Sequence, residues 1–137
     1  MKEITHQFSK FHLSESSNIV SDSVPGERSK ELLDLQKEIE GAVVSYPRSM
    51  PFAIKKAKGA IIEDVDGNQY IDFFAGCGVL NVGHCNEEVL SYVKKQQDQL
   101  IHALDFPTEN KLSAIQKIIK NLPKAVQNDY KVSFGGP

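Results

Sequence analysis

The chain of 137 residues is long enough to form one domain with a hydrophobic core. Its composition, 40% hydrophobic and 25% charged, is typical of a soluble globular protein, and its net charge of −2 argues against nucleic acid or an anionic membrane as partner. The N-terminus lacks the order of a signal peptide, and the longest uncharged run, residues 73–85, is too short and too rich in glycine to span a bilayer.

The two cysteines, Cys77 and Cys85, stand eight positions apart. They form neither a Cys-x-x-Cys motif nor an obvious disulfide framework. We therefore expect a reduced, cytoplasmic setting and no metal site.

Residues 1–26 are polar and rich in serine, and they end in Pro25-Gly26, which predicts a flexible or loosely docked arm. Residues 27–40 place apolar side chains at helical spacing, and Gly41 is a typical stop signal. This segment predicts an amphipathic helix with one buried stripe, formed by Leu32, Leu35 and Ile39 with Leu33 beside them.

A small antiparallel sheet is expected after this helix. Prolines at positions 47 and 51 break regular structure, and a short strand is expected around residues 52–56. Gly59 separates that strand from a hairpin whose turn is Asp66-Gly67-Asn68, with apolar residues on both sides. The three short strands predict a sheet that needs another element packed on its face.

The last strand of the hairpin runs into a loop with glycines at positions 76, 78 and 83. Glycine lets the backbone adopt conformations closed to other residues and lie close to another molecule. An uncharged, partly apolar loop of this kind is a candidate pocket wall. The pattern alone favours the alternative, a tightly packed turn.

Two helices and a strand are expected in the rest of the chain. Asn86 is a typical N-cap, and a second helix begins at Pro107-Thr108. Residues 131–134 predict a strand that enters a glycine pair. Because such a strand is typical of the start of an α/β sheet, we expect a larger domain to begin where the chain ends. The second helix carries a wide apolar stripe, Leu112, Ile115, Ile118, Ile119 and Leu122.

Residues 58–73 and 76–84 resemble the N-terminal part of the class III aminotransferases, which are pyridoxal-phosphate enzymes of fold type I. In that family an Asp-x-Asp-Gly-x-x-Tyr-Ile/Leu-Asp-Phe hairpin leads to a glycine-rich segment and Gly-His. Residues 102–108 and 134–137 resemble the diaminobutyrate aminotransferase branch. One departure is Glu87, where members usually carry proline; glutamate is also compatible with a helix start.

The resemblance implies an α/β fold of type I, of which this chain supplies only the N-terminal portion. That portion comprises the N-terminal helix, the small three-stranded antiparallel sheet, and helices that lead into the first strand of the large-domain sheet. It divides into an arm (1–26), the first part of the small domain (27–85) and the truncated start of the large cofactor-binding domain (86–137).

The resemblance also places Cys77, Gly78 and Val79 in the wall of the substrate pocket, near the dimer interface of the family. For Cys77, a small buried apolar residue is an equal alternative, and we do not expect a nucleophile. His84 and Cys85 are expected to be structural; for His84 the reason is that no carboxylate partner stands at a fixed spacing.

The cofactor implied by the resemblance is pyridoxal 5'-phosphate. In relatives, Phe-x-Gly-Pro continues into Thr-Gly-Ser/Thr, which holds the cofactor phosphate, so Gly136 and Pro137 are weak cofactor-binding candidates. The Schiff-base lysine and the aspartate of the pyridine nitrogen lie further along in the family, which leaves no catalytic residue in this chain. We expect solvated side chains at the lysines of positions 55, 56, 58, 94 and 95.

The implied reaction is transfer of an amino group from a diamino acid or ω-amino donor, most like L-2,4-diaminobutyrate, to 2-oxoglutarate by a homodimer. The isolated chain is expected to be inactive, and to be poorly soluble, oligomeric or partly disordered. Two alternatives remain open: a non-catalytic binding or assembly module derived from such an enzyme, and one half of a split enzyme.

Overall fold

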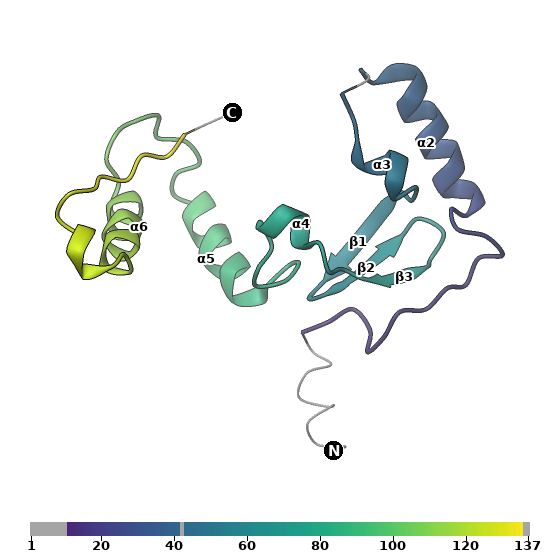
Figure 1. The fold of residues 1–137 in the computed structure, drawn as a ribbon, viewed down its shortest axis with the longest axis horizontal. Coiled ribbons are helices and arrows are strands. Elements are labelled where there is room, and N and C mark those ends of the chain that lie inside the picture. The colour runs from purple at the N-terminus through teal and green to yellow at the C-terminus, as the bar shows by residue number, and fades with distance from the viewer. Residues whose placement is uncertain (1–10, 42, 136–137) are drawn as a thin grey trace, which may run out of the picture. The chain divides into compact units, whose positions relative to one another are not determined.

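The computed structural model describes residues 11–41 and 43–135, which fall into two compact units, Met1–Val93 and Lys94–Pro137 (Figure 1). The first unit holds α2 (Glu27–Ile39), α3 (Tyr46–Ser49), β1 (Ile54–Lys58), β2 (Ile61–Asp64), β3 (Gln69–Ile71) and α4 (Ala75–Gly78). Helix α5 (Glu87–Gln97) crosses the division, and α6 (Glu109–Lys120) and the 3-10 turn η1 (Lys124–Val126) follow in the second unit. The sequence-based boundary, between residues 85 and 86, falls just before α5.

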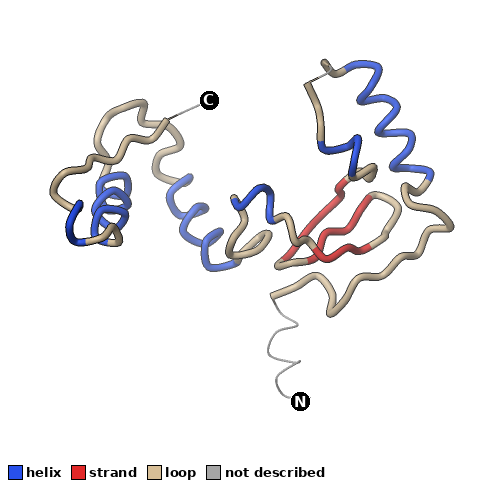
Figure 2. The backbone as a smooth tube through the Cα atoms, viewed as in Figure 1, coloured by secondary structure: helices blue, strands red, loops and turns tan. Residues whose placement is uncertain are grey.

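The three strands form an antiparallel sheet in the order β1-β2-β3, as predicted (Figure 2). Ile61 pairs with Lys58 on one side and with Ile71 on the other. Strand β1 begins at Ile54, later than residue 52, where the sequence predicted it. The carbonyl of Ala53 instead accepts the amide of Val65 at 2.9 Å, which ties the approach to β1 to the hairpin turn.

The hairpin turn is built around the fully buried carboxylate of Asp64. Its Oδ1 accepts the amides of Asp66 (2.9 Å) and Asn68 (2.8 Å). Its Oδ2 accepts the Asn68 side-chain amide and the Tyr70 hydroxyl, each at 2.8 Å. Four donors therefore satisfy one buried charge, and this is the arrangement in which a carboxylate tolerates removal from water.

The second buried polar side chain of the turn, Asn68, joins the turn to the N-terminal segment. Its Oδ1 accepts the amides of Val20 and Ser21 at 2.9 Å each, and the Ser21 hydroxyl at 3.0 Å. Because its amide group donates to Asp64, one side chain links a segment nearly fifty residues earlier to the core of the turn.

The segment 11–26 also pairs with the edge of the sheet. The amide of Asn18 donates to the carbonyl of Gln69 (2.9 Å), and the amide of Gln69 donates back to Asn18 (2.7 Å), in an isolated antiparallel bridge. These contacts dock the described part of the predicted arm against β3. Residues 1–10 lie outside the described residues, and there the flexible arm stays a prediction.

Helix α2 is held at its N-terminus by the hairpin turn. Its N-cap, Gly26, supplies no side-chain bond. The two carboxylate oxygens of Asp66 instead accept the amides of Arg28 (2.8 Å) and Ser29 (2.9 Å), which are unpaired donors in the first helical turn. Hydrogen bonding from Ser29 and from the Arg28 backbone outweighs burial and lowers the pKa of Asp66.

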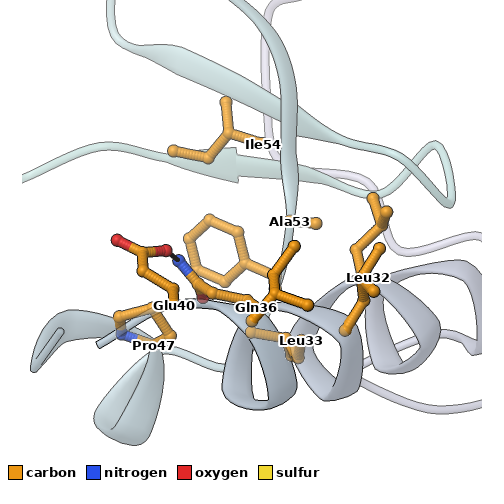
Figure 3. A pocket seen from close by; sticks show the side chains of 10 residues that line it. Leu32, Leu33, Gln36, Glu40, Pro47, Ala53 and Ile54 are labelled. Atoms are coloured by element: carbon orange, nitrogen blue, oxygen red, sulfur yellow. Dashed lines mark hydrogen bonds between the residues drawn. The ribbon is translucent and has the colours of Figure 1, made fainter. Parts of the chain in front are cut away.

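The apolar stripe of α2 is not buried as the sequence predicted. Leu35 is 48% exposed and Ile39 is 73% exposed. The stripe lines an open groove with Phe52, Ala53 and Ile54 at the start of β1 (Figure 3). Among the described residues only Ile61 and Ile62 are buried hydrophobic side chains, so these residues supply too little packed surface to cover the stripe.

Both later helices begin where the sequence predicts. Asn86 Oδ1 accepts the amide of Val89 (3.1 Å) at the start of α5, and the Thr108 hydroxyl accepts the amide of Lys111 (3.1 Å) at the start of α6. The predicted strand at 131–134 was wrong for the described chain, because these residues form no strand. A strand requires a hydrogen-bonded neighbour, and no described segment pairs with this one.

Tyr70 provides a test of the buried turn. Burial, together with the hydrogen bond to Asp64, raises its pKa from 10.0 to about 12. Because the folded-state pKa is higher, this contribution to stability is complete below pH 10 and is lost as the pH rises to about 12. Tyr70→Phe keeps the ring that stacks on Phe52 and should lower the free energy of unfolding by about 1 kcal/mol at pH 7.

Urea unfolding of both proteins at pH 7, 10 and 12 measures this effect. The difference between them should be largest at neutral pH, shrink as the pH rises above 10, and reverse in sign toward pH 12. The reason is that the raised pKa of Tyr70 costs the folded state about 1.4 kcal/mol for each pH unit between 10.0 and about 12, whereas phenylalanine does not ionise. An equal difference at all three pH values would contradict the raised pKa of Tyr70 in the folded chain.

Candidate functional site

The glycine-rich loop after β3 begins with the short segment α4, which is a left-handed turn and not a regular right-handed helix. Residues Ala75, Gly76, Cys77 and Gly78 have φ values of 49°, 57°, 58° and 84°, and the amide of Leu80 closes the turn on the carbonyl of Ala75 at 2.9 Å. The glycines adopt this backbone without strain, whereas for the alanine and the cysteine it costs about 1 kcal/mol each. Strain of this kind clusters at functional sites, so this turn is the first candidate in the chain.

The predicted pocket-wall residues lie on this turn and face solvent. Cys77 and Gly78 are exposed, and Val79 is 82% exposed. The alternative of a small buried apolar residue at position 77 does not match this exposure. The other alternative for this loop, a tightly packed turn, does not match its exposure either. The turn that buries its side chains is the hairpin turn, in which Asp64 and Asn68 are fully buried.

Tyr46 holds the thiol of Cys77. The Tyr46 hydroxyl and the Cys77 Sγ lie 3.1 Å apart, and the hydrogen bond between them raises the pKa of Tyr46. The Tyr46 ring also contacts the ring of Phe74 edge-on, with centroids 5.3 Å apart. Sequence reasoning missed Tyr46, because its surroundings predicted only a proline-rich break between elements.

Asp72 and His84 pair across the loop. The Nε2 of His84 lies 2.7 Å from Oδ2 of Asp72, and both side chains are largely buried. The other oxygen of Asp72 accepts the amides of Phe74 (2.8 Å) and Ala75 (2.9 Å). Burial tends to raise the pKa of Asp72, but the bonds from His84 and from these two amides lower it below its usual value.

The carboxylate partner of His84 therefore exists, although the sequence analysis found none. Asp72 stands twelve positions earlier, and the two residues meet only because the loop between them closes on itself. Two features of the sequence could have indicated the pair: an aspartate at the end of a strand and a histidine after a glycine. Neither signal gives the distance between them.

The base of the loop rests on the turn between β1 and β2. Gly59 and His84 exchange two backbone hydrogen bonds of 2.8 Å each, and the amide of Asp72 donates to the carbonyl of Ala60 at 2.8 Å. At Gly83, with φ of 85°, a Cβ would stand 3.0 Å from the Cα of Gly59. A side chain at position 83 would therefore be strained by the positive φ and would require the Gly59 backbone to shift by a few tenths of an ångström.

The described residues show no unsatisfied buried polar side-chain atom that would mark the place of a pyridoxal phosphate. In the described part of the chain every buried side-chain nitrogen and oxygen has a hydrogen-bond partner, so no buried polar atom awaits a phosphate or a ring nitrogen. Lys55 and Lys56 pair with Glu63, and Lys58 pairs with Glu87 at 2.7 Å. The candidates Gly136 and Pro137 lie outside the described residues.

Two further features are absent over residues 11–41 and 43–135. No three His, Cys, Asp or Glu side chains there are grouped as metal ligands. No described helix has the length and apolar character needed to cross a membrane.

The sequence model of the aminotransferase class-III family matches residues 43–134, which includes the sheet, the loop and both later helices. The chain belongs to the class-III aminotransferases. It is 40% identical over 109 residues to the diaminobutyrate–2-oxoglutarate transaminase of Virgibacillus pantothenticus, covering 77% of this chain and 26% of that protein. It is 38% identical over 107 residues to the diaminobutyrate–2-oxoglutarate aminotransferase of Haemophilus influenzae, covering 77% and 23%.

Solved structures agree with the predicted fold class of this family member. The ornithine aminotransferase of Toxoplasma gondii matches with a TM-score of 0.59 and 26% identity, over 67% of this chain and 21% of that one. The ornithine δ-aminotransferase of Plasmodium falciparum matches with a TM-score of 0.59 at 19% identity, which shows the fold alone. The chain spans about a quarter of the length of the curated relatives it matches.

Proposed function

We propose that this chain forms one wall of the substrate pocket of a pyridoxal-phosphate-dependent transaminase, through Cys77, Gly78 and Val79. The enzyme would transfer an amino group from L-2,4-diaminobutyrate, or from a related diamino or ω-amino donor, to 2-oxoglutarate. The observation that carries the proposal is the family match over 43–134, which spans the loop. The relatives that are about 40% identical are diaminobutyrate transaminases, and this supports the choice of donor.

The geometry of the loop supports the same role. Cys77 and Val79 are exposed on a strained turn, and the Cys77 thiol is fixed by Tyr46. A turn that served only packing would bury these side chains, as Asp64 and Asn68 are buried in the hairpin. A strained and exposed turn on a hydrogen-bonded base is the arrangement expected of a wall that contacts a ligand.

The exposed apolar surface of the chain supports assembly with further polypeptide, which we propose belongs to a homodimeric cytoplasmic enzyme. Large apolar side chains are exposed along it, among them Phe73 at 92% and Ile101 at 86%. The same exposure favours the second candidate, a non-catalytic assembly module or one half of a split enzyme. Both candidates place a partner surface over these side chains.

The isolated chain of 137 residues should not catalyse transamination. In its described residues every buried side-chain nitrogen and oxygen already has a hydrogen-bond partner, and the chain spans about a quarter of its relatives. Purified protein mixed with pyridoxal 5'-phosphate, L-2,4-diaminobutyrate and 2-oxoglutarate should show no shift of cofactor absorbance and no glutamate. Either signal would contradict the proposal that this chain contributes a wall and not a complete site.

A further inference from the structure

We propose that Asp72 and His84 are positioning residues. Their side-chain pair holds the two ends of the loop 73–83 together and so fixes the position of Cys77–Val79. This inference deepens the proposed function and rests on it for its biological meaning. It states that the Asp72–His84 pair stabilises the closed conformation of the loop 73–83. That coupling can be measured without substrate.

Asp72 acts on the first end of the loop. Its backbone amide is bound to the carbonyl of Ala60, and its Oδ1 accepts the amides of Phe74 and Ala75, which enter the left-handed turn. A carboxylate that accepts two successive amides sets the direction in which the chain leaves the strand. The remaining oxygen, Oδ2, is the one that meets His84.

His84 acts on the second end. Its amide and carbonyl are both bonded to Gly59, and Gly83 packs closely against the same glycine, with a built Cβ 3.0 Å from the Gly59 Cα. The backbone of the second end is therefore anchored to the turn between β1 and β2. The 2.7 Å contact from His84 Nε2 to Asp72 then joins this anchored end to the carboxylate that orients the first end.

The result is a closed loop whose ends lie together, the form of a compact Ω-loop, a class that frequently carries function. The strained residues Ala75 and Cys77 lie inside it. Strained backbone persists only where its surroundings over-determine it. The Asp72–His84 pair supplies that constraint at the neck of the loop.

Amide hydrogen exchange of the full chain, resolved to single residues, tests the role of the Asp72–His84 pair in the variants His84→Ala and His84→Gln. The reporter is the amide of Leu80, bonded to Ala75 inside the loop, and the reference is the amide of Asp64, bonded to Asn68 in the hairpin. In His84→Ala, exchange at Leu80 should rise about tenfold, which corresponds to about 1.4 kcal/mol, while exchange at Asp64 stays unchanged. His84→Gln places a donor where Nε2 stood and should restore most of the protection.

His12→Ala is the matched control. Its Nδ1 accepts the amide of Ala60 at 3.1 Å, next to the loop base but outside the loop, so Leu80 should keep its exchange rate. The inference is overturned if His84→Ala leaves Leu80 unchanged, raises Leu80 and Asp64 equally, or is matched in full by His84→Gln. It is also overturned if Asp64 shows no protection in the unsubstituted chain, because the hairpin of the sheet from which the loop leaves would then be absent. None of these outcomes bears on whether the loop contacts substrate.

Discussion

Asp64→Ala should abolish the hairpin turn and release the N-terminal segment from the sheet. The substitution removes the acceptor of four hydrogen bonds, and the donors of Asn68 and Tyr70 lose their partner in a largely buried setting. Each buried donor left unsatisfied costs about 1–3 kcal/mol, so the total loss should reach about 3 kcal/mol or more. Few other contacts compensate, because only Ile61 and Ile62 are buried hydrophobic residues in the described chain.

The amides of Gln69 and Val20 report the loss directly. Gln69 bonds to Asn18 in the docked segment, and Val20 bonds to the Asn68 side chain. Both should exchange at the rate of unstructured chain in Asp64→Ala. In the control Asp98→Ala, which removes an exposed carboxylate just after α5, both should keep their protection. Protection at Gln69 that survives Asp64→Ala would show that the turn does not depend on this carboxylate.

Local chemistry was sufficient to predict those features that depend on neighbouring residues. The hairpin turn at Asp66-Gly67-Asn68 and the caps Asn86 and Thr108 lie where the sequence places them, because each is determined within a few positions. The family resemblance likewise rested on nearly continuous sequence, residues 58–73 and 76–84, and the family match confirms it.

Features that depend on distant residues could not be predicted in the same way. The Asp72–His84 pair forms only when the loop closes, and Asn68 meets Val20 across 48 positions. Helical spacing predicted the apolar stripe of α2 correctly, but burial requires an opposing surface that spacing alone does not supply. The strand predicted at 131–134 does not form for the same reason, because no described strand lies beside it.

Cys77→Trp should lower the transaminase activity of an enzyme that carries this segment by about a hundredfold, because a large side chain in the wall displaces the donor from its reactive position. The host for the test is a chimaera in which residues 43–134 replace the matching part of the Virgibacillus pantothenticus transaminase. Cys77 is exposed, and its side-chain contact among the described residues is the Tyr46 hydroxyl, so the larger side chain replaces that contact without entering a packed core. Tyr92→Trp, at a 70% exposed aromatic of α5 outside the loop, is the control.

The decisive measurement is kcat/KM for L-2,4-diaminobutyrate in the chimaera, in its Cys77→Trp variant and in its Tyr92→Trp variant, with bound cofactor followed by absorbance in all three. If Cys77–Val79 form the pocket wall, kcat/KM falls about a hundredfold only in Cys77→Trp, while cofactor absorbance is kept. An unchanged kcat/KM in Cys77→Trp, or a chimaera that binds no cofactor, would contradict the account.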